Sequence, residues 1–501
     1  MSAQSIETAS DIREGDRRRW LILSVLVVAQ FMVVLDVAIV NVALPTIKND
    51  LHFSEGGLQW VITAYAIVFG GVLLLGGRMA DLLGRRRIFM VGMAVFTIFS
   101  LLNGLAWSSG SLIAFRGLQG LGAALLAPAA LSILTTTFRE GRDRNVALGI
   151  WGAASGSGGA AGVLLGGALT SALSWSWIFF INVPVGILVL AISPLLLEES
   201  RADLDHRHFD TAGAASITGG LMLLVYALTR ASQHGWATAE TVGLLAASAA
   251  LVVAFVVIEM RSPAPLLPLR IFRLRTLTAS NITALLLGAA VFSQFFLLTL
   301  YMQQVLHYSA LKTGVAYIPL TLSIIGFSAI SQGLVTRVGI RLVLPVGMAL
   351  SAAGLVLYAQ LPVHGTYFAN LFPAFILSGI GLAFAFVPMS IGALTGVRSD
   401  DAGVASGLLN TNQQIGGAIG VAIATTIATT YTSHFLQGHA GLGPLDGAAL
   451  THGFQIAFYV LAALAALAAV ISAIMIEPGA AATIPTEESL SKLTPALEEA
   501  A

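Results

Sequence analysis

Fourteen long apolar segments constrain this chain more than any other feature of its sequence. Each is close to the roughly 20 residues that a helix needs to cross the hydrocarbon core of a bilayer. They lie near residues 20–44, 58–77, 88–107, 111–135, 146–169, 177–197, 212–229, 241–260, 280–301, 313–335, 342–361, 367–391, 403–429 and 453–476. Only 10% of the 501 residues are charged, against about 25% in a soluble domain. The sequence therefore predicts an all-α integral membrane protein with fourteen spans.

Basic residues predict how these spans are oriented. Of the 25 Lys and Arg residues, only Lys48, Arg230 and Lys312 fall in the odd-numbered connections, and Arg116 alone falls inside a span. Lys and Arg collect on the cytoplasmic side of a membrane. Both termini and the connection that holds Arg85 are therefore expected in the cytoplasm, in a multi-pass protein of the inner (cytoplasmic) membrane. The first apolar segment is too long for a removable signal.

An internal repeat divides the chain into two halves. A shift of 255 residues places 54–86 on 309–341 without a gap, and Gly84 then meets Gly339. The first six spans thus echo the last six, a parallel plan that is typical of transporters with a substrate site between the halves. The expected divisions are a cytoplasmic tail (1–19), an N-terminal six-helix bundle (20–199), a linker with an inserted helix pair (200–275), a C-terminal six-helix bundle (276–477) and a disordered cytoplasmic tail (478–501).

A densely charged stretch separates the second and third apolar segments. It reads GRMADLLGRRR over residues 77–87, and we expect it to be a loop that latches the cytoplasmic side. A solvated cluster of orienting charges is the alternative, and it accounts for the arginines but not for Asp81. The expected gate residues are Gly77, Asp81, Gly84, Arg85 and Arg86, with the two glycines permitting a tight hairpin.

One acid and one base lie deep within the predicted spans. These are Asp36 in the first span and Arg116 in the fourth. A rise of about 1.5 Å per residue places them at similar depth, close enough to pair. Such residues usually mark a proton or substrate pathway, because burial disfavours the charged form of a carboxyl group. The alternatives are a permanent packing pair and an arginine bonded to backbone carbonyls.

Uncharged polar and aromatic side chains are numerous in the segments that would line a central cavity. Apolar walls with a few amides suit an amphiphilic substrate, although hydrogen bonding between helices explains any single one of them better. The candidates are Gln30, Asn41, Tyr65, Gln119, Phe292, Gln294, Phe296, Gln303, Asn410, Gln413 and Gln414.

Four segments resemble motifs of the major facilitator superfamily, in particular its fourteen-span drug:proton antiporters of the EmrB/QacA type. They are residues 35–45, 77–87, 112–124 and 177–186. The resemblance implies a major facilitator fold of two six-helix bundles plus an inserted helix pair. It also implies that the first and fourth spans line the cavity. We therefore expect Asp36 and Arg116 to take part in proton coupling, as a pair that a proton on Asp36 releases. The charged stretch would stabilise the outward-facing state through contacts with neighbouring helix ends.

The fifth span departs from the family pattern. The antiporter motif normally carries a Gly-Pro pair, but here Val163 follows Gly162. The span keeps a face of small residues that suits close packing against another helix. The expected packing residues are Gly158, Gly162, Gly166 and Gly167.

Together these features predict a proton-coupled secondary transporter that exports amphiphilic drugs or toxic compounds. The sequence offers no metal-ligand spacing, phosphate-binding loop or nucleophile–base pair. We therefore expect no enzyme activity, no cofactor, no nucleic acid and no ATPase subunit, with the proton gradient as the energy source. The single deep acid favours a neutral or monocationic substrate. An exporter dedicated to one natural product or metabolite is the alternative within transport, and a non-transporting membrane sensor is a further alternative.

Overall fold

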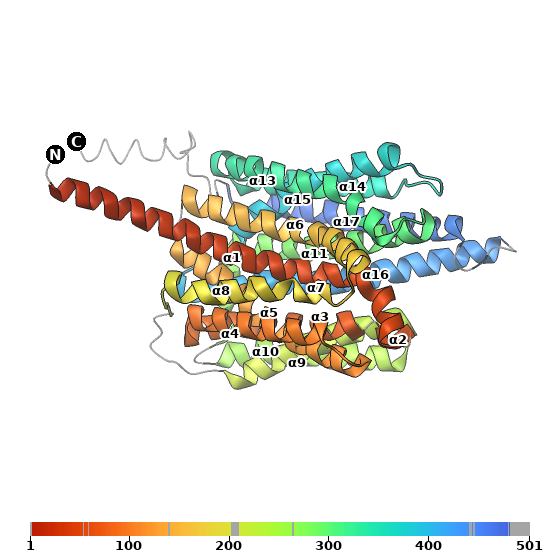
Figure 1. The fold of residues 1–501 in the computed structure, drawn as a ribbon, viewed down its shortest axis with the longest axis horizontal. Coiled ribbons are helices and arrows are strands. Elements are labelled where there is room, and N and C mark those ends of the chain that lie inside the picture. Colours follow the sequence, from red (N-terminus) through yellow and green to blue (C-terminus); the bar gives the residue numbers. More distant parts are fainter. Residues whose placement is uncertain are drawn as a thin grey trace.

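The chain folds as a bundle of long helices that run roughly parallel to one another (Figure 1). The computed structural model describes residues 3–53, 55–58, 60–138, 141–201, 210–262, 265–439, 443, 446–478 and 480. Within these ranges, thirteen helices are long and apolar enough to cross a bilayer. A fourteenth span is bent by 41° between Arg142–Gly159 and Ala161–Ala172. The expected all-α membrane architecture is confirmed.

Six spans form the first half of the molecule. They are α1 (Ala3–Asp50), α3 (Trp60–Leu83), which the short α2 (Glu55–Leu58) precedes, α4 (Arg85–Gly104), α5 (Ser109–Thr137), α6 (Arg142–Ala172), and a last span that is divided into α7 (Trp177–Phe180) and α8 (Asn182–Leu196). Helix α1 begins at Ala3, so most of the expected N-terminal tail continues the first span as helix. This stretch is rich in helix-forming residues and contains no proline, which would end a helix.

The remaining helices are the inserted pair and the second half. The pair is α9 (Thr211–His234) and α10 (Ala239–Arg261). The second half contains α11 (Arg275–Leu300), α12 (Ala310–Ala316), α13 (Ile318–Val338), α14 (Ile340–Tyr358), α15 (Phe372–Gly392), α16 (Ala402–Gly438) and α17 (Gly447–Met475). Four short helices accompany them: the 3₁₀ helices η1 (Leu269–Arg273) and η4 (Ser399–Asp401), and the π-helices η2 (Tyr301–Val305) and η3 (Tyr367–Leu371). Nearly all of the expected disordered C-terminal tail lies outside the described residues.

Matching glycines show the repeat in the backbone. Gly84 precedes α4 with φ +115°, and Gly339 precedes α14 with φ +82°. Both conformations favour glycine because a Cβ atom would be strained there. The one-residue connection is therefore a feature that the two halves of this chain share. We refer to the end of the bundle where α3 meets α4 as the Gly84 end.

The expected charged loop at residues 77–87 is not a loop. Helix α3 continues to Leu83 and α4 begins at Arg85, so Gly84 alone separates them. Asp81 consequently lies in the last turn of α3 and is fully buried. The charges remain helical because they bond to one another and to neighbouring helix ends, as described below.

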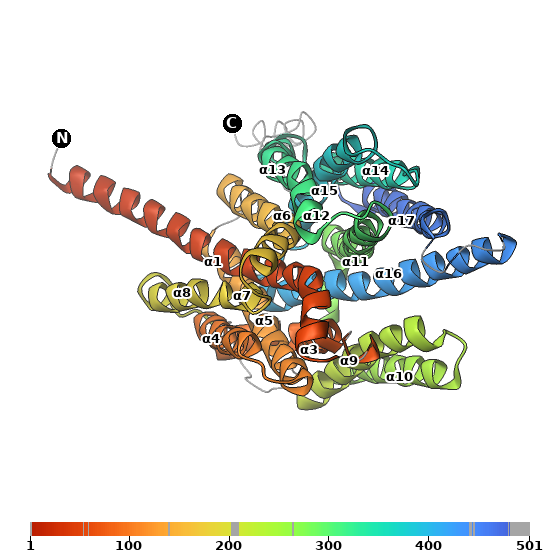
Figure 2. The same ribbon diagram turned by 45° about the vertical axis from the view of Figure 1, so that its right-hand side comes forward.

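The inserted pair lies along the seam between the two halves, beside α3 and away from α13 and α14 (Figure 2). A Cβ atom built on Gly70 of α3 would contact both Gln414 of α16 and Val225 of α9, at 3.9 and 4.0 Å. In addition, the Trp236 indole that follows α9 donates to Thr426 Oγ1 of α16 at 2.8 Å. The pair thus contacts both halves instead of forming a separate unit.

Candidate functional site: a buried charge network and a closed helix end

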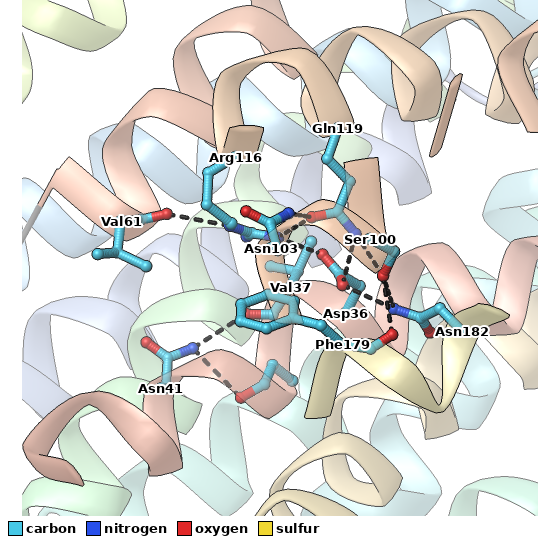
Figure 3. A network of polar contacts seen from close by, with 11 residues as sticks. Asp36, Val37, Asn41, Val61, Ser100, Asn103, Arg116, Gln119, Phe179 and Asn182 are labelled. Atoms are coloured by element: carbon cyan, nitrogen blue, oxygen red, sulfur yellow. Dashed lines mark hydrogen bonds and ion pairs between the residues drawn. The ribbon is translucent and has the colours of Figure 1, made fainter. Parts of the chain in front are cut away.

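Asp36 is the centre of a buried polar network in the first half (Figure 3). Its side chain on α1 is fully buried. Arg116 Nη1 on α5 donates to Oδ2 at 2.6 Å. Gln119 Nε2 on α5 and Asn182 Nδ2 on α8 both donate to Oδ1, each at 2.9 Å. The structure therefore brings together the two deep charges that the sequence placed at similar depth, and it adds two amide donors.

Arg116 also contacts groups other than Asp36. Its Nε donates to the Val61 carbonyl of α3 at 3.1 Å, and its Nη1 also donates to Gln119 Oε1 at 2.6 Å. The guanidinium carbon lies 4.3 Å from the centre of the Tyr65 ring, a distance suited to cation–π attraction. Arg116 thus pairs with an acid and also bonds to a backbone carbonyl.

A second layer of uncharged side chains surrounds the pair. Asn103 Nδ2 on α4 donates to Gln119 Oε1 at 2.8 Å. Ser100 Oγ, also on α4, accepts from Gln119 at 3.2 Å and from Asn182 at 3.0 Å. Sequence reasoning missed Ser100, Asn103 and the role of Asn182. The signal in the sequence is weak, because isolated neutral polar residues are common in membrane helices.

Glycines of α6 fix the position of α1 around Asp36. A Cβ atom on Gly158 would lie 2.9 Å from Val34 Cβ, and one on Gly162 would lie 2.8 Å from the Leu35 carbonyl oxygen. A Cβ atom on Gly166 would lie 2.8 Å from the Ile39 carbonyl oxygen. These three glycines lie on the face of α6 that packs against α1, and Gly167 is also buried. Close backbone contact of this kind leaves α1 little freedom to shift alone.

The second half contains an uncharged counterpart of this network. Phe375 stands at the repeat position of Arg116 and Ser378 at that of Gln119, both shifted by 259 residues. Ser378 Oγ donates to Gln294 Oε1 of α11 at 3.1 Å. The Phe375 ring packs against Tyr317, with ring centres 5.1 Å apart. The deep charges thus belong to one half alone.

Asp81 joins the two halves at the Gly84 end. Its carboxylate accepts from Arg85 Nη2 at 2.9 Å and Nε at 3.2 Å. It also accepts from the backbone N–H groups of Gly403 and Val404, at 3.1 and 3.2 Å, in the first turn of α16. A carboxylate is favourable there because unpaired N–H groups and the helix dipole make a helix N-terminus partly positive. The expected contact with a neighbouring helix end is present.

Small residues allow α3 and α16 to meet so closely. A Cβ atom on Gly77 would overlap the carbonyl oxygen of Gly403, and it would also crowd Gly407. At the same end, Glu199 Oε1 accepts from the Arg86 N–H at 3.2 Å. A second contact joins the two halves. Arg144 Nη2 on α6 donates to the Leu394 carbonyl at 2.9 Å, which was not foreseen from the sequence.

The candidate substrate-binding residues fall into three groups. Tyr65 and Gln119 belong to the charge network and Gln294 to its counterpart. Gln30 donates to Ser155 of α6, and the Asn41 and Asn410 amides bond to carbonyls of their own helices. The other five are half-buried, on α11, η2 and α16: Phe292, Phe296, Gln303, Gln413 and Gln414. Three of the candidate amides, Gln30, Gln119 and Gln294, therefore bond to a neighbouring helix in this conformation.

Comparison with known proteins identifies the family. The model of the Major Facilitator Superfamily matches residues 26–421 of the chain. The chain belongs to the major facilitator superfamily. The human organic anion transporter MFSD10 (TETRAN) has a similar fold, with a TM-score of 0.63 at 15% identity over 91% of this chain and 99% of that one.

Several relatives within the superfamily carry functional names. The chain is 39% identical to a puromycin resistance protein of Streptomyces alboniger, over 99% of this chain and 98% of the relative. It is 41% identical to a cephamycin export protein of Amycolatopsis lactamdurans, over 78% and 82%. It is 36% identical to a tetracenomycin C resistance and export protein of Streptomyces glaucescens, over 80% and 74%. The chain is thus a multi-pass membrane transporter of the major facilitator superfamily and not an enzyme.

Proposed function

We propose that this protein exports amphiphilic antibiotics or similar toxic compounds from the cell in exchange for protons. The names of its relatives support drug export. The observation that carries the proton-coupling proposal is the buried Asp36–Arg116 pair. A membrane-embedded carboxylate that can be neutralised is the usual means of moving a proton through such a transporter.

The geometry suggests how a proton would change the site. In the charged form, Asp36 accepts three hydrogen bonds and balances Arg116. A proton on Asp36 Oδ2 would remove the ionic part of the Arg116 contact, while Val61 and Gln119 would continue to hold the guanidinium. The site would then carry one net positive charge, which disfavours a cationic substrate nearby. Proton and cation would therefore compete, as antiport requires.

In a cycle of alternating access, the contacts at the Gly84 end would keep the transporter closed to the cytoplasm. We place this end in the cytoplasm, where the basic residues collect, with both termini on the same side of the inner membrane. The Asp81 contacts to α16 and the Arg144 contact to Leu394 would hold the cytoplasmic ends of the two halves together. Both contacts must break before a substrate can enter from the cytoplasm.

The substrate is proposed to be a neutral or monocationic amphiphile, with no cofactor and the proton gradient as the energy source. An exporter dedicated to one natural product is a second candidate, because the relatives named above are each associated with a single antibiotic. A susceptibility panel in a host that lacks its own pumps separates the two. Resistance to one chemical class alone supports the dedicated exporter.

The decisive test of proton coupling is Asp36→Asn in proteoliposomes with an imposed pH gradient. We expect the variant to lose gradient-driven export while expression stays near normal. Glu240→Gln is a suitable control, because Glu240 lies in the inserted pair, where it is half exposed and bonded to Arg230. Gradient-driven transport that persists in Asp36→Asn would refute the assignment.

A further inference from the structure

We propose that Asn182 is a positioning residue for Asp36, which stabilises the deprotonated carboxylate and ties it to the break between α7 and α8. The inference rests on the proposed proton coupling but concerns the carboxylate itself. It begins with the place of Asn182 in the fold. Asn182 is the first residue of α8, directly after the single residue that separates α8 from α7. Its side chain is 1% exposed.

The hydrogen bonds fix the orientation of the Asn182 amide. Ser100 Oγ has one proton and donates it to the Phe179 carbonyl of α7 at 2.9 Å. The lone pairs of that hydroxyl are left to accept, so the groups from Asn182 and Gln119 that meet it must be N–H donors. The NH₂ group of Asn182 therefore faces Ser100. Its second proton is directed to Asp36 Oδ1, at 2.9 Å.

Donation to Asp36 favours the charged form of the carboxyl group. A hydrogen bond to an ionised acceptor is stronger than one between neutral groups. Loss of this bond therefore destabilises the charged form of Asp36 more than its protonated form. The other ionisable groups that face Asp36 are Arg116 from α5 and Tyr65 from α3. Helices α7 and α8 carry no ionisable residue, and those of α4 and α6 are confined to the first turn of each helix. Asn182 is thus an uncharged means of adjusting the affinity of Asp36 for a proton.

The same contacts join Asp36 to the last span of the first half. Ser100 bonds both to the final turn of α7, through Phe179, and to the start of α8, through Asn182. The α7–α8 junction is therefore attached to α4 and α1 by one small group of bonds. A proton on Asp36 would weaken one of these attachments at the one place where this span is not continuous helix.

An infrared titration of the purified full-length protein tests the proposal without requiring transport. The carboxylic C=O band that is absent from Asp36→Asn reports the protonation of Asp36. In Asn182→Leu, which has a similar volume but no donor, we expect the midpoint of this band to move up by about one pH unit, as the loss of one charge-assisted hydrogen bond predicts. In Asn182→Gln, which keeps the amide, the midpoint should lie closer to that of the unsubstituted protein.

Asn103→Leu is the matched control. Asn103 belongs to the same network but donates to Gln119 and not to Asp36, so its removal should leave the midpoint nearly unchanged. Equal midpoints in Asn182→Leu and the unsubstituted protein would overturn the proposal, as would equal shifts in the two leucine variants. If Asn182→Leu does not fold, a wild-type midpoint in Asn182→Ser, whose hydroxyl is too short to reach Asp36, gives the same refutation. Failure of proton-coupled export would appear separately, in the liposome experiment with Asp36→Asn.

Discussion

Asp36 and Arg116 are each nearly inaccessible to solvent, and this burial determines how a substitution of either one affects the stability of the protein. The exposed fractions are 0% and 1%. Ionic groups in such an environment lose their hydration, and mutual attraction with further hydrogen bonds must replace it. Here Gln119, Asn182 and the Val61 carbonyl supply those bonds. The pair is therefore stable only as a complete unit, and a change to one partner affects the other.

Arg116→Leu should destabilise the protein more than the double change Asp36→Leu with Arg116→Leu. The single variant leaves Asp36 buried without its counterion, which costs about 3–5 kcal/mol. The double variant leaves no uncompensated charge, so its loss of stability should be smaller. Thermal unfolding of the detergent-purified proteins measures both. A double variant that is less stable than Arg116→Leu would show that the pair is not the dominant interaction here.

At the scale of elements, the contact between α3 and α16 determines whether the Gly84 end is closed. The helices approach through Gly77, Gly403 and Gly407, and Asp81 bonds to the first turn of α16. Backbone contact at glycines is short-ranged, so it is lost as soon as the helices separate. A closed end of this kind behaves as a switch between two arrangements and not as a flexible joint.

Gly77→Ala should favour the open arrangement of this end. Its Cβ atom would overlap the Gly403 carbonyl, which is backbone and cannot move aside alone. We expect faster labelling of a single cysteine introduced near the Gly84 end, and reduced export. Gly117→Ala on α5 is the control, since its nearest neighbours would be at ordinary contact distance, 3.8 and 3.9 Å. The absence of native cysteines makes the labelling specific.

Asp81→Asn should slow turnover with little effect on substrate binding. The amide keeps the side-chain volume but loses the charge that favours the α16 N-terminus and the ion pair with Arg85. Transport rate and cysteine accessibility, measured on the same preparations, report the effect. Unchanged values for both would leave only a role in orienting the spans.

At the scale of the whole molecule, the two halves share a backbone plan but not a charge plan. Gly84 and Gly339 each precede a matching helix and have a positive φ, whereas Phe375 replaces Arg116 and Thr336 replaces Asp81. No acid lies within the predicted spans of the second half. The inserted pair contacts both halves along one seam and adds no charged residue deep in the bilayer. If the protein exchanges protons as proposed, the charged residues that take part are those of the first half.

This asymmetry predicts poor transport of dications. A lone Asp36 that serves proton exchange leaves no fixed negative charge to compensate the desolvation of a second positive charge. We expect gradient-dependent export of a monocationic dye to exceed that of a dicationic dye of similar size by at least about tenfold, a difference of roughly 1.4 kcal/mol. Ethidium and propidium form a matched pair for efflux assays. Strong gradient-dependent transport of the dication would contradict the prediction.

The sequence by itself determined the class of protein, the spans and the repeat. Long apolar segments allow only helices in a bilayer, since each backbone group must be bonded within its own segment. Charge is also so costly in hydrocarbon that Asp36 and Arg116 stand out among the residues of the apolar segments. The family motifs pointed to the same fold. These are local properties, so they are visible in the amino-acid sequence itself.

Only the tertiary structure showed which groups form hydrogen bonds with the buried charges. Asn182 lies 146 residues from Asp36, and Gly403 lies 322 residues from Asp81. Neutral amides and helix N–H groups give no signal in composition, because most of them bond within their own helix. For the same reason the charged stretch was expected to be a loop, although burial against α16 keeps it helical. Which amide completes a charge depends on how helices pack, and packing is set by contacts between residues far apart in the chain.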